Sequence, residues 1–272
     1  MDRIPSDQEE RPMMNLVRWL PPSGAGCQTP AARNAALTVG ATGLDEISAM
    51  RALIDSDIGL QDVRALGPQT IRRWAVAAEA GDRETPLHIE RMSRYSAILA
   101  RTLGLDDARC EEIRIAAQLH DVGKVGLPDE ILSNPALLSQ DERDVAEEHC
   151  EIGHRILSGW SSLLLDLAAE IALTHHERVD GTGYPHGLFG SEIPLAGRIA
   201  AIADVFDALT SERPYRAAWS VEGAVEFMSS ERGTHFNHEL LDRFFVAMPE
   251  ILEVKQQYPD PVTERGTASQ LR

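Results

Sequence analysis

Two stretches of this 272-residue sequence decide its fold: HDVGKVGLPD at residues 120–129 and HHERVDGTGYP at residues 175–185. Each follows a run of apolar residues with helical spacing, which reaches Ala117 before the first stretch and Ile171 before the second. The second stretch opens a Gly- and Pro-rich segment, residues 177–194, that is too long for a simple connection between helices. Strand signals are sparse, so we expect an all-α domain with one long loop, of the kind that is functional or disordered.

Helical faces continue outward from these two stretches. Ser139 and Glu142 have the spacing of a capping box, which predicts the start of a further helix. The expected faces comprise Met92, Tyr95, Leu99 and Leu103; Ile113, Ala117 and His120; Val145, Ile152 and Ile156; and Leu164, Ala168 and Ile171.

The chain divides into four segments by composition. Residues 1–43 are rich in Pro, Gly, Ala, Ser and Thr without periodicity, and we expect a flexible arm. Residues 44–64 are expected to form a short helical N-terminal segment, residues 65–257 the folded domain, and residues 258–272 a polar tail.

Composition excludes several classes of protein. A formal net charge of −17 argues against a binder of bulk nucleic acid or of membrane surfaces, because both use Lys and Arg to meet phosphates. No run approaches the ~18 uninterrupted apolar residues of a membrane span. The acidic N-terminus is unlike a secretory signal, so we expect a cytoplasmic protein. Three scattered cysteines do not form a disulfide framework or a zinc ribbon.

The histidines form a second regularity, because all nine follow residue 83. Four of them fall on the apolar sides of four predicted helices: His88, His120, His149 and His175. A lone inward histidine is usually a hydrogen-bonded core residue. Four of them with carboxylates nearby indicate a metal site, because burying such groups without a counter-charge costs several kcal/mol apiece.

The carboxylates and one further histidine complete the candidate ligands. Asp121 follows His120, Glu84 precedes His88 by one helical turn, Asp204 lies in a mostly apolar run, and His176 is adjacent to His175. Mixed imidazole and carboxylate ligands suit Mn, Fe, Zn, Co or Ni. Eight candidate ligands are more than one ion can use, so we expect two or three divalent metal ions.

The two opening stretches resemble the signature segments of the HD-GYP family, the cyclic di-GMP phosphodiesterases within the HD superfamily of metal-dependent phosphohydrolases. Residues 84–92 and 203–216 are similar to the leading and later helices of that family, and the match covers roughly residues 65–255. The resemblance implies an HD-type helical bundle with a long GYP loop, and composition predicts a short, partly disordered, helical N-terminal segment before it. Asn134-Pro135-Ala136 departs from the usual Lys-Pro-Gly near the entry loop, which leaves the ligand set intact.

The resemblance also implies a division of the ligands between ions. One metal is held by His88, His120, Asp121 and Asp204, and Asp121 bridges to a second metal held by His149, His175 and His176. Glu84 occupies the position of a ligand to a third ion, although a carboxylate there also suits the N-terminus of a helix. Iron and manganese are the favoured metals.

The implied reaction is hydrolysis of cyclic di-GMP to linear pGpG or GMP by a metal-bridging hydroxide. We expect Lys124 to reach the pocket and neutralise the phosphate or the hydroxide, and Asp207 to hold the attacking water or Lys124; Asp207 also suits a helix surface. Tyr184 is expected to stack on guanine or contact the ligand by its hydroxyl. Arg213 and Arg216 suit phosphate contacts, or a surface pair.

Other interpretations stay open at this point. Arg178 and Asp180 are expected to form a structural ion pair in the GYP loop, and His154, His186, His235 and His238 to be surface or structural residues. The alternatives to a cyclic di-GMP phosphodiesterase are another HD-superfamily nucleotide phosphohydrolase, a non-catalytic cyclic di-GMP receptor, and a purely structural helical protein. Residues 1–64 are too short and too poor in β-pattern for a receiver domain, and are expected to mediate homodimerisation or to bind a signalling partner.

Overall fold

The computed structural model describes residues 47–54, 68–78, 86–134, 138–212 and 217–260. Within these residues every regular element is helical, and β-type pairing is limited to two isolated bridges, Asp180 with Phe189 and Arg232 with Phe236. The expected all-α fold is confirmed. The arm predicted for residues 1–43 lies outside the described residues.

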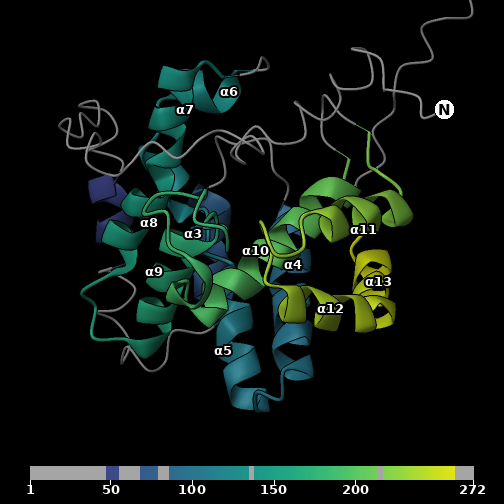
Figure 1. The fold of residues 1–272 in the computed structure, drawn as a ribbon. Coiled ribbons are helices and arrows are strands. Elements are labelled where there is room, and N and C mark those ends of the chain that lie inside the picture. Colours follow the sequence, from purple (N-terminus) through teal and green to yellow (C-terminus); the bar gives the residue numbers. More distant parts are fainter. Residues whose placement is uncertain (1–46, 55–67, 79–85, 135–137, 213–216, 261–272) are drawn as a thin grey trace, which may run out of the picture.

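In the described residues from 68 to 257, eleven α-helices, labelled in Figure 1, and two short 3-10 helices make up the element order of the domain. Their order is α3 Pro68–Ala78, α4 Pro86–Thr102, α5 Asp107–Ala117, η4 Val122–Gly126, α6 Asp129–Ser133, α7 Gln140–Glu147, α8 His149–Leu157, α9 Leu163–Thr174, η5 Gly190–Glu192, α10 Leu195–Thr210, α11 Val221–Ser230, α12 His238–Val246 and α13 Met248–Gln257, with η marking 3-10 helices.

Helix α4 is central to the bundle and packs against α5, α10, α12 and α13 (Figure 1). The ring of Tyr95 on α4 meets Phe206 of α10 edge-on with centroids 5.7 Å apart, and Phe206 meets Phe244 of α12 at 5.3 Å. All three side chains are fully buried. Because aromatic pairs in this geometry add specific attraction to the area they bury, they hold α10 in a defined position against α4.

A close approach of backbones brings η4 against α8. A Cβ atom placed on Gly123 would lie 1.9 Å from the carbonyl oxygen of His149 and 2.4 Å from the amide nitrogen of Gly153. Only glycine is compatible with this contact. As a result, the turn that carries Asp121 and Lys124 lies directly beside His149.

Residues 47–54 are helical, as expected for the described part of the N-terminal segment, and dock on the domain at the end of α8. Met50 and Ile54 are buried in the main core. Arg51 donates from Nη1 to the carbonyl oxygens of Arg155 and Ile156 at the end of α8, the latter at 3.1 Å. These contacts fix this helix against the domain.

Three details differ from the expectations. The capping box of Ser139 and Glu142 is present, but the helix it starts ends at Glu147, and a turn at Glu148 separates it from α8. His120 follows the end of α5 in a turn rather than on its apolar face. The polar tail expected from residue 258 begins with residues that fold back onto α4, since the ring of Tyr258 lies 4.9 Å from the guanidinium of Arg94.

Candidate metal centre

Two clusters of potential metal ligands meet where α4, η4, α8, α9 and α10 converge. The first comprises His88, His120 and Asp204, and the second Asp121, His149, His175 and His176. Within each cluster the ligand atoms lie within 4.8 Å of one another. The structure therefore brings together seven of the eight ligands predicted from the sequence.

Asp121 lies between the two clusters. Its Oδ2 is 3.3 Å from Nε2 of His120, while its Oδ1 is 3.3 Å from Nε2 of His149 and 3.4 Å from Nε2 of His175. Farther into the first cluster, Nε2 of His88 is 3.4 Å from Oδ1 of Asp204. A carboxylate that turns each oxygen toward different histidines has the geometry of a bridging ligand.

Hydrogen bonds from the opposite ring nitrogens orient the histidines. Nδ1 of His120, His149 and His175 each donates to a main-chain carbonyl oxygen about one helical turn earlier, at 2.7 to 3.1 Å. Because a carbonyl oxygen only accepts, Nδ1 must carry a proton, so Nε2 is the ring atom that faces the cluster and can bind a metal. In the same way, Nδ1 of His88 donates to Oδ2 of Asp207 at 2.9 Å. These second partners are the ones that metal-ligating histidines ordinarily have.

The spacing and the polar atoms left over fit divalent ions. Two ligands about 2.1 Å from one ion lie about 3.0 to 3.4 Å apart at octahedral to tetrahedral angles, which matches the distances around Asp121. The buried atoms of the described residues that make no hydrogen bond include Nε2 of His120 and of His175, Nδ1 of His176, and Oδ1 of Asp121. Leaving each unsatisfied costs about 1–3 kcal/mol, which coordination to a metal would offset.

Burial and neighbouring charges shift the pKa values of these groups in different directions, and an ion bound at His120 would first displace a proton from its ring. Burial disfavours the charged form of His120, but the carboxylate of Asp121 outweighs it and raises the pKa of His120 to about 9. Burial also opposes ionisation of Asp121, yet Lys124 and His120 hold its pKa well below the usual value. Burial lowers the pKa of His175 and, with the neighbouring histidines, lowers that of His176 further. Both are therefore neutral at pH 7, the form in which histidine binds a metal.

Lys124 reaches the centre, as predicted. Its Nζ donates to Oδ2 of Asp121 at 2.6 Å, and the side chain is 2% exposed. This buried ammonium places a positive charge beside the carboxylate that lies between the two clusters.

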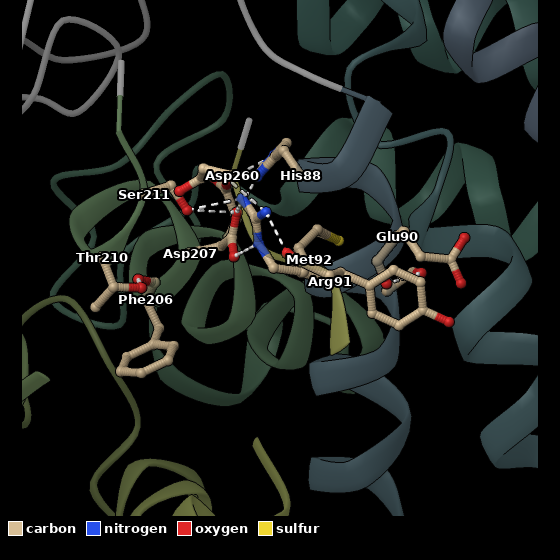
Figure 2. A network of polar contacts seen from close by, with 12 residues as sticks. His88, Glu90, Arg91, Met92, Phe206, Asp207, Thr210, Ser211 and Asp260 are labelled. Atoms are coloured by element: carbon tan, nitrogen blue, oxygen red, sulfur yellow. Dashed lines mark hydrogen bonds and ion pairs between the residues drawn. The ribbon is translucent and has the colours of Figure 1, made fainter. Parts of the chain in front are cut away.

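Asp207 was expected to hold the attacking water or Lys124, but its carboxylate faces Arg91 and His88 instead. Its Oδ1 accepts from Nε of Arg91 at 2.6 Å, and its Oδ2 accepts from Nη2 of Arg91 at 2.8 Å and from Nδ1 of His88 (Figure 2). Ser211 Oγ adds a contact to Oδ2 at 3.2 Å. With both oxygens occupied and the residue fully buried, Asp207 orients the His88 ring and has no surface for a water or for Lys124. The alternative of a helix-surface carboxylate is wrong as well.

Tyr184 does not offer the free ring face that stacking on guanine needs, and the expected hydroxyl contact stays a prediction. Its side chain is 2% exposed, and its ring stacks on that of His176 with centroids 4.8 Å apart. Burial of the ring leaves no face for a guanine base. Tyr184 therefore packs behind a candidate ligand, from the loop that the sequence marked as functional.

Polar contacts hold the GYP loop in place. Arg178 pairs with Asp180, Nε to Oδ1 at 3.7 Å, as predicted, and more closely with Glu231, Nη2 to Oε2 at 2.7 Å. The buried carboxylate of Glu177 accepts from the main-chain amides of His186 at 2.8 Å and Leu188 at 2.9 Å. The loop is thus tied both to itself and to the turn after α11.

The remaining predicted residues are placed as follows. Glu84, Arg213 and Arg216 lie outside the described residues. The four histidines expected to be surface or structural are exposed (His186, His238), half-buried (His154) or buried against Phe236 with ring centroids 4.1 Å apart (His235).

The family model described as HD domain matches residues 74–240. The chain belongs to the HD domain family. Phosphohydrolases with an HD domain are metal-dependent, in agreement with the His and Asp clusters of this chain. The resemblance seen in the opening stretches is confirmed.

Several relatives of this HD domain are cyclic dinucleotide phosphodiesterases by name. The chain is 40% identical over 199 residues to the cyclic di-GMP phosphodiesterase response regulator RpfG of Xanthomonas campestris pv. campestris, covering 73% of this chain and 53% of the relative. It is 43% identical over 189 residues to a cyclic di-GMP phosphodiesterase of Thermotoga maritima, covering 70% and 51%. It is 40% identical over 199 residues to the 3'3'-cGAMP-specific phosphodiesterase 2 of Vibrio cholerae, covering 73% and 38%.

The HD domain thus spans about half the length of the curated relatives it matches, or less. Among solved structures, a cyclic GMP-AMP specific phosphodiesterase of Vibrio cholerae shares the fold with a TM-score of 0.50 and 22% identity, covering 69% of this chain and 52% of the other.

In the described part of the chain, no helix is both long and apolar enough to cross a bilayer.

Sequence reasoning missed the groups that support the HD ligands. Arg91 is 1% exposed and sits one turn after His88, where a charged residue interrupts a mostly buried helix. That interruption was the available signal. Nothing local, however, connects Arg91 with Asp207, which lies 116 residues away in the chain.

Proposed function

We propose that this HD domain is a phosphodiesterase that hydrolyses cyclic di-GMP to linear pGpG, to GMP, or to both, and so lowers the level of that messenger. The observation that carries the proposal is the position of Asp121 between two histidine clusters, in a chain about 40% identical to phosphodiesterases named for this substrate. A complete ligand set with a buried lysine beside it favours turnover over the alternative of a non-catalytic receptor.

Each group has a role in this proposal. When bound, two divalent ions supply an activated water and clamp the phosphate oxygens of a phosphodiester. His88, His120 and Asp204 hold one ion, His149, His175 and His176 hold the other, and Asp121 bridges them. The mixture of imidazole and carboxylate ligands favours iron or manganese. A third ion at Glu84 stays a prediction.

The ammonium of Lys124 neutralises charge on the reacting phosphate. It stands 2.6 Å from the proposed bridging carboxylate and is held there by burial. Arg213 and Arg216 follow the end of α10 in the sequence and are proposed to meet the second phosphate of the substrate by bidentate contacts. Base stacking is not assigned to Tyr184, because its ring is covered.

A second candidate substrate is 3'3'-cGAMP. The chain is as similar to a 3'3'-cGAMP-specific enzyme of Vibrio cholerae as to the Xanthomonas cyclic di-GMP enzyme, at 40% identity over 199 residues in both cases. The two substrates differ in one base and share the phosphodiester ring, so the metal centre serves either. The distinction must come from groups that contact the bases.

The test is a parallel hydrolysis assay. Metal-replete protein, loaded with Fe²⁺ or with Mn²⁺, is incubated with cyclic di-GMP and separately with 3'3'-cGAMP, and the linear products and mononucleotides are separated by chromatography. We expect pGpG or GMP from cyclic di-GMP. Absence of pGpG and GMP from cyclic di-GMP with both metals would refute the proposal, and cleavage of 3'3'-cGAMP alone would favour the second candidate substrate.

A matched pair of variants tests the bridging role. Asp121→Ala should abolish turnover and reduce the bound metal together, whereas Asp242→Ala, at a surface pair with Arg232, should change neither. Metal stoichiometry that is unchanged in Asp121→Ala contradicts bridging by this carboxylate.

A role of the N-terminal segment in homodimerisation or partner binding, and placement in the cytoplasm, stay predictions from the sequence.

A further inference from the structure

The first residues after α13 complete a buried arginine site. The carbonyl oxygen of Tyr258 accepts from Nη1 of Arg91 at 3.0 Å, and Oδ1 of Asp260 pairs with the same Nη1 at 2.9 Å. On its other edge, Arg91 donates to Asp207 from Nε and Nη2, and to Oγ of Ser211 from Nη2 at 2.7 Å. Four of these contacts are hydrogen bonds and Asp260 adds an ion pair, so each of the three guanidinium nitrogens has a partner.

The C-terminal residues thereby determine how Arg91 faces Asp207. A guanidinium is rigid and planar, so fixing Nη1 also fixes the Nε and Nη2 edge that grips the carboxylate. Asp207 in turn accepts from Nδ1 of His88 at 2.9 Å (Figure 2). A continuous path that begins with the ion pair of Asp260 and Arg91 and goes on through charge-assisted hydrogen bonds therefore runs from Asp260 through Arg91 and Asp207 to the ring of His88.

Asp260 holds a second element at the same time. Its Oδ2 accepts from the main-chain amide of Glu212 at 3.0 Å, just after α10 ends at Thr210. The same helix carries Asp204 and Asp207. One carboxylate near the end of the described chain therefore joins α4 to the exit of α10, the two helices that present His88 and Asp204 to each other.

We propose that Asp260 is a positioning residue for the metal centre, which fixes His88 through Arg91 and Asp207 and so sets the affinity of the His88, His120 and Asp204 cluster for its ion. The second cluster, around His149, has no part in this path and keeps its affinity when Asp260 is changed. The inference rests on the proposed function only in taking divalent ions as the occupants of the two clusters.

The test compares Mn²⁺ binding by the full chain and its variants. Asp260→Ala removes both acceptors, and Asp260→Asn keeps one acceptor oxygen at the same volume. Asp242→Ala is the control, because Asp242 also makes a close pair with an arginine, Nη2 of Arg232 to Oδ2 at 2.6 Å, but on the surface. Calorimetric titration of metal-free protein gives the two dissociation constants, and elemental analysis gives the stoichiometry.

For Asp260→Ala we expect one Mn²⁺ dissociation constant to rise about tenfold, as is typical when a support behind a metal ligand is lost, while the other changes less than twofold. Asp260→Asn should fall between wild type and Asp260→Ala, and Asp242→Ala should match wild type. Two unchanged constants in Asp260→Ala overturn the proposal.

An equal rise of both constants also overturns the proposal, because it indicates general loosening of the fold. If Asp260→Ala does not fold, Asp260→Asn decides by the same criterion of one constant changed and one kept. These constants do not depend on hydrolysis. A wild-type protein that binds two Mn²⁺ but cleaves neither cyclic dinucleotide would refute the proposed function and leave this inference testable.

Discussion

The exchange Asp207→Asn tests the support of the metal centre at its strongest contact. Asp207 is fully buried, and its two oxygens face Nε and Nη2 of Arg91 at 2.6 and 2.8 Å. An asparagine keeps the volume but replaces one oxygen by an NH₂ group. In either orientation of the amide, an N–H group is set against an N–H group of Arg91. The variant thus removes a charge and creates a donor conflict without opening a cavity.

The magnitude follows from the burial of both partners. Removing one member of a buried ion pair costs about 3–5 kcal/mol, because the remaining charge is left desolvated. We take the lower end, about 3 kcal/mol, because Asp260 still faces Nη1 of Arg91 at 2.9 Å. For a domain of this size that corresponds to a fall in Tm of about 6–12 °C. Weaker support of His88 should lower metal affinity by roughly 10- to 100-fold.

The assay separates the two effects. Thermal unfolding of metal-free protein, followed by circular dichroism, measures stability without any contribution from the ion, and Mn²⁺ titration measures the affinity of the folded variant. The control is Asp242→Asn, the same exchange at a surface pair, which should leave both readouts unchanged. A metal-free Tm within 2 °C of wild type for Asp207→Asn would refute the argument, since a destabilisation of about 3 kcal/mol could not then be present.

Three further outcomes are expected. Burial, reinforced by Arg178, lowers the pKa of His235, so the unfolded chain binds a proton first as the pH falls. The free energy of unfolding is therefore reduced below about pH 6.5, by up to about 2 kcal/mol at pH 5. Urea unfolding of His235→Gln should show a flatter dependence on pH than wild type. Gly123→Ala should destabilise by about 3 kcal/mol, because its Cβ would overlap main-chain atoms of α8, whereas Gly223→Ala, with an ordinary 3.4 Å contact, should be neutral or stabilising in the same unfolding assay. Lys124→Gln should lower kcat for cyclic di-GMP about 100-fold with bound metal unchanged by elemental analysis, and an unchanged kcat would exclude a role for its charge.

The ligands were predictable because their chemistry is independent of context. Metal coordination needs particular side-chain types, and His88, His120 and His175 stand out in a sequence as polar residues at apolar positions. The capping box at Ser139 was predictable for a similar reason, because a cap is made within four residues of chain. The break at Glu148 was not, because one helical period continues across it.

Roles that depend on a distant partner could not be predicted. Asp207 lies one turn after Asp204, and that position predicts a contact with the attacking water or with Lys124. Arg91 and His88, from a helix more than one hundred residues earlier, occupy both of its oxygens instead. Tyr184 lies in a loop that the sequence marks as functional, yet its ring is stacked against His176. In both cases the sequence predicted that the residue lies near the centre, but it did not predict which groups the residue contacts.

By itself, the sequence determined that this chain is helical, and it predicted a set of candidate metal ligands with a lysine among them. The tertiary structure alone decided that Asp207 supports His88 and that Asp260 reaches Arg91. The physical reason is that ligand identity and helical periodicity are local properties of the chain, whereas a buried charge takes whichever partner the packing of distant helices brings within hydrogen-bond distance.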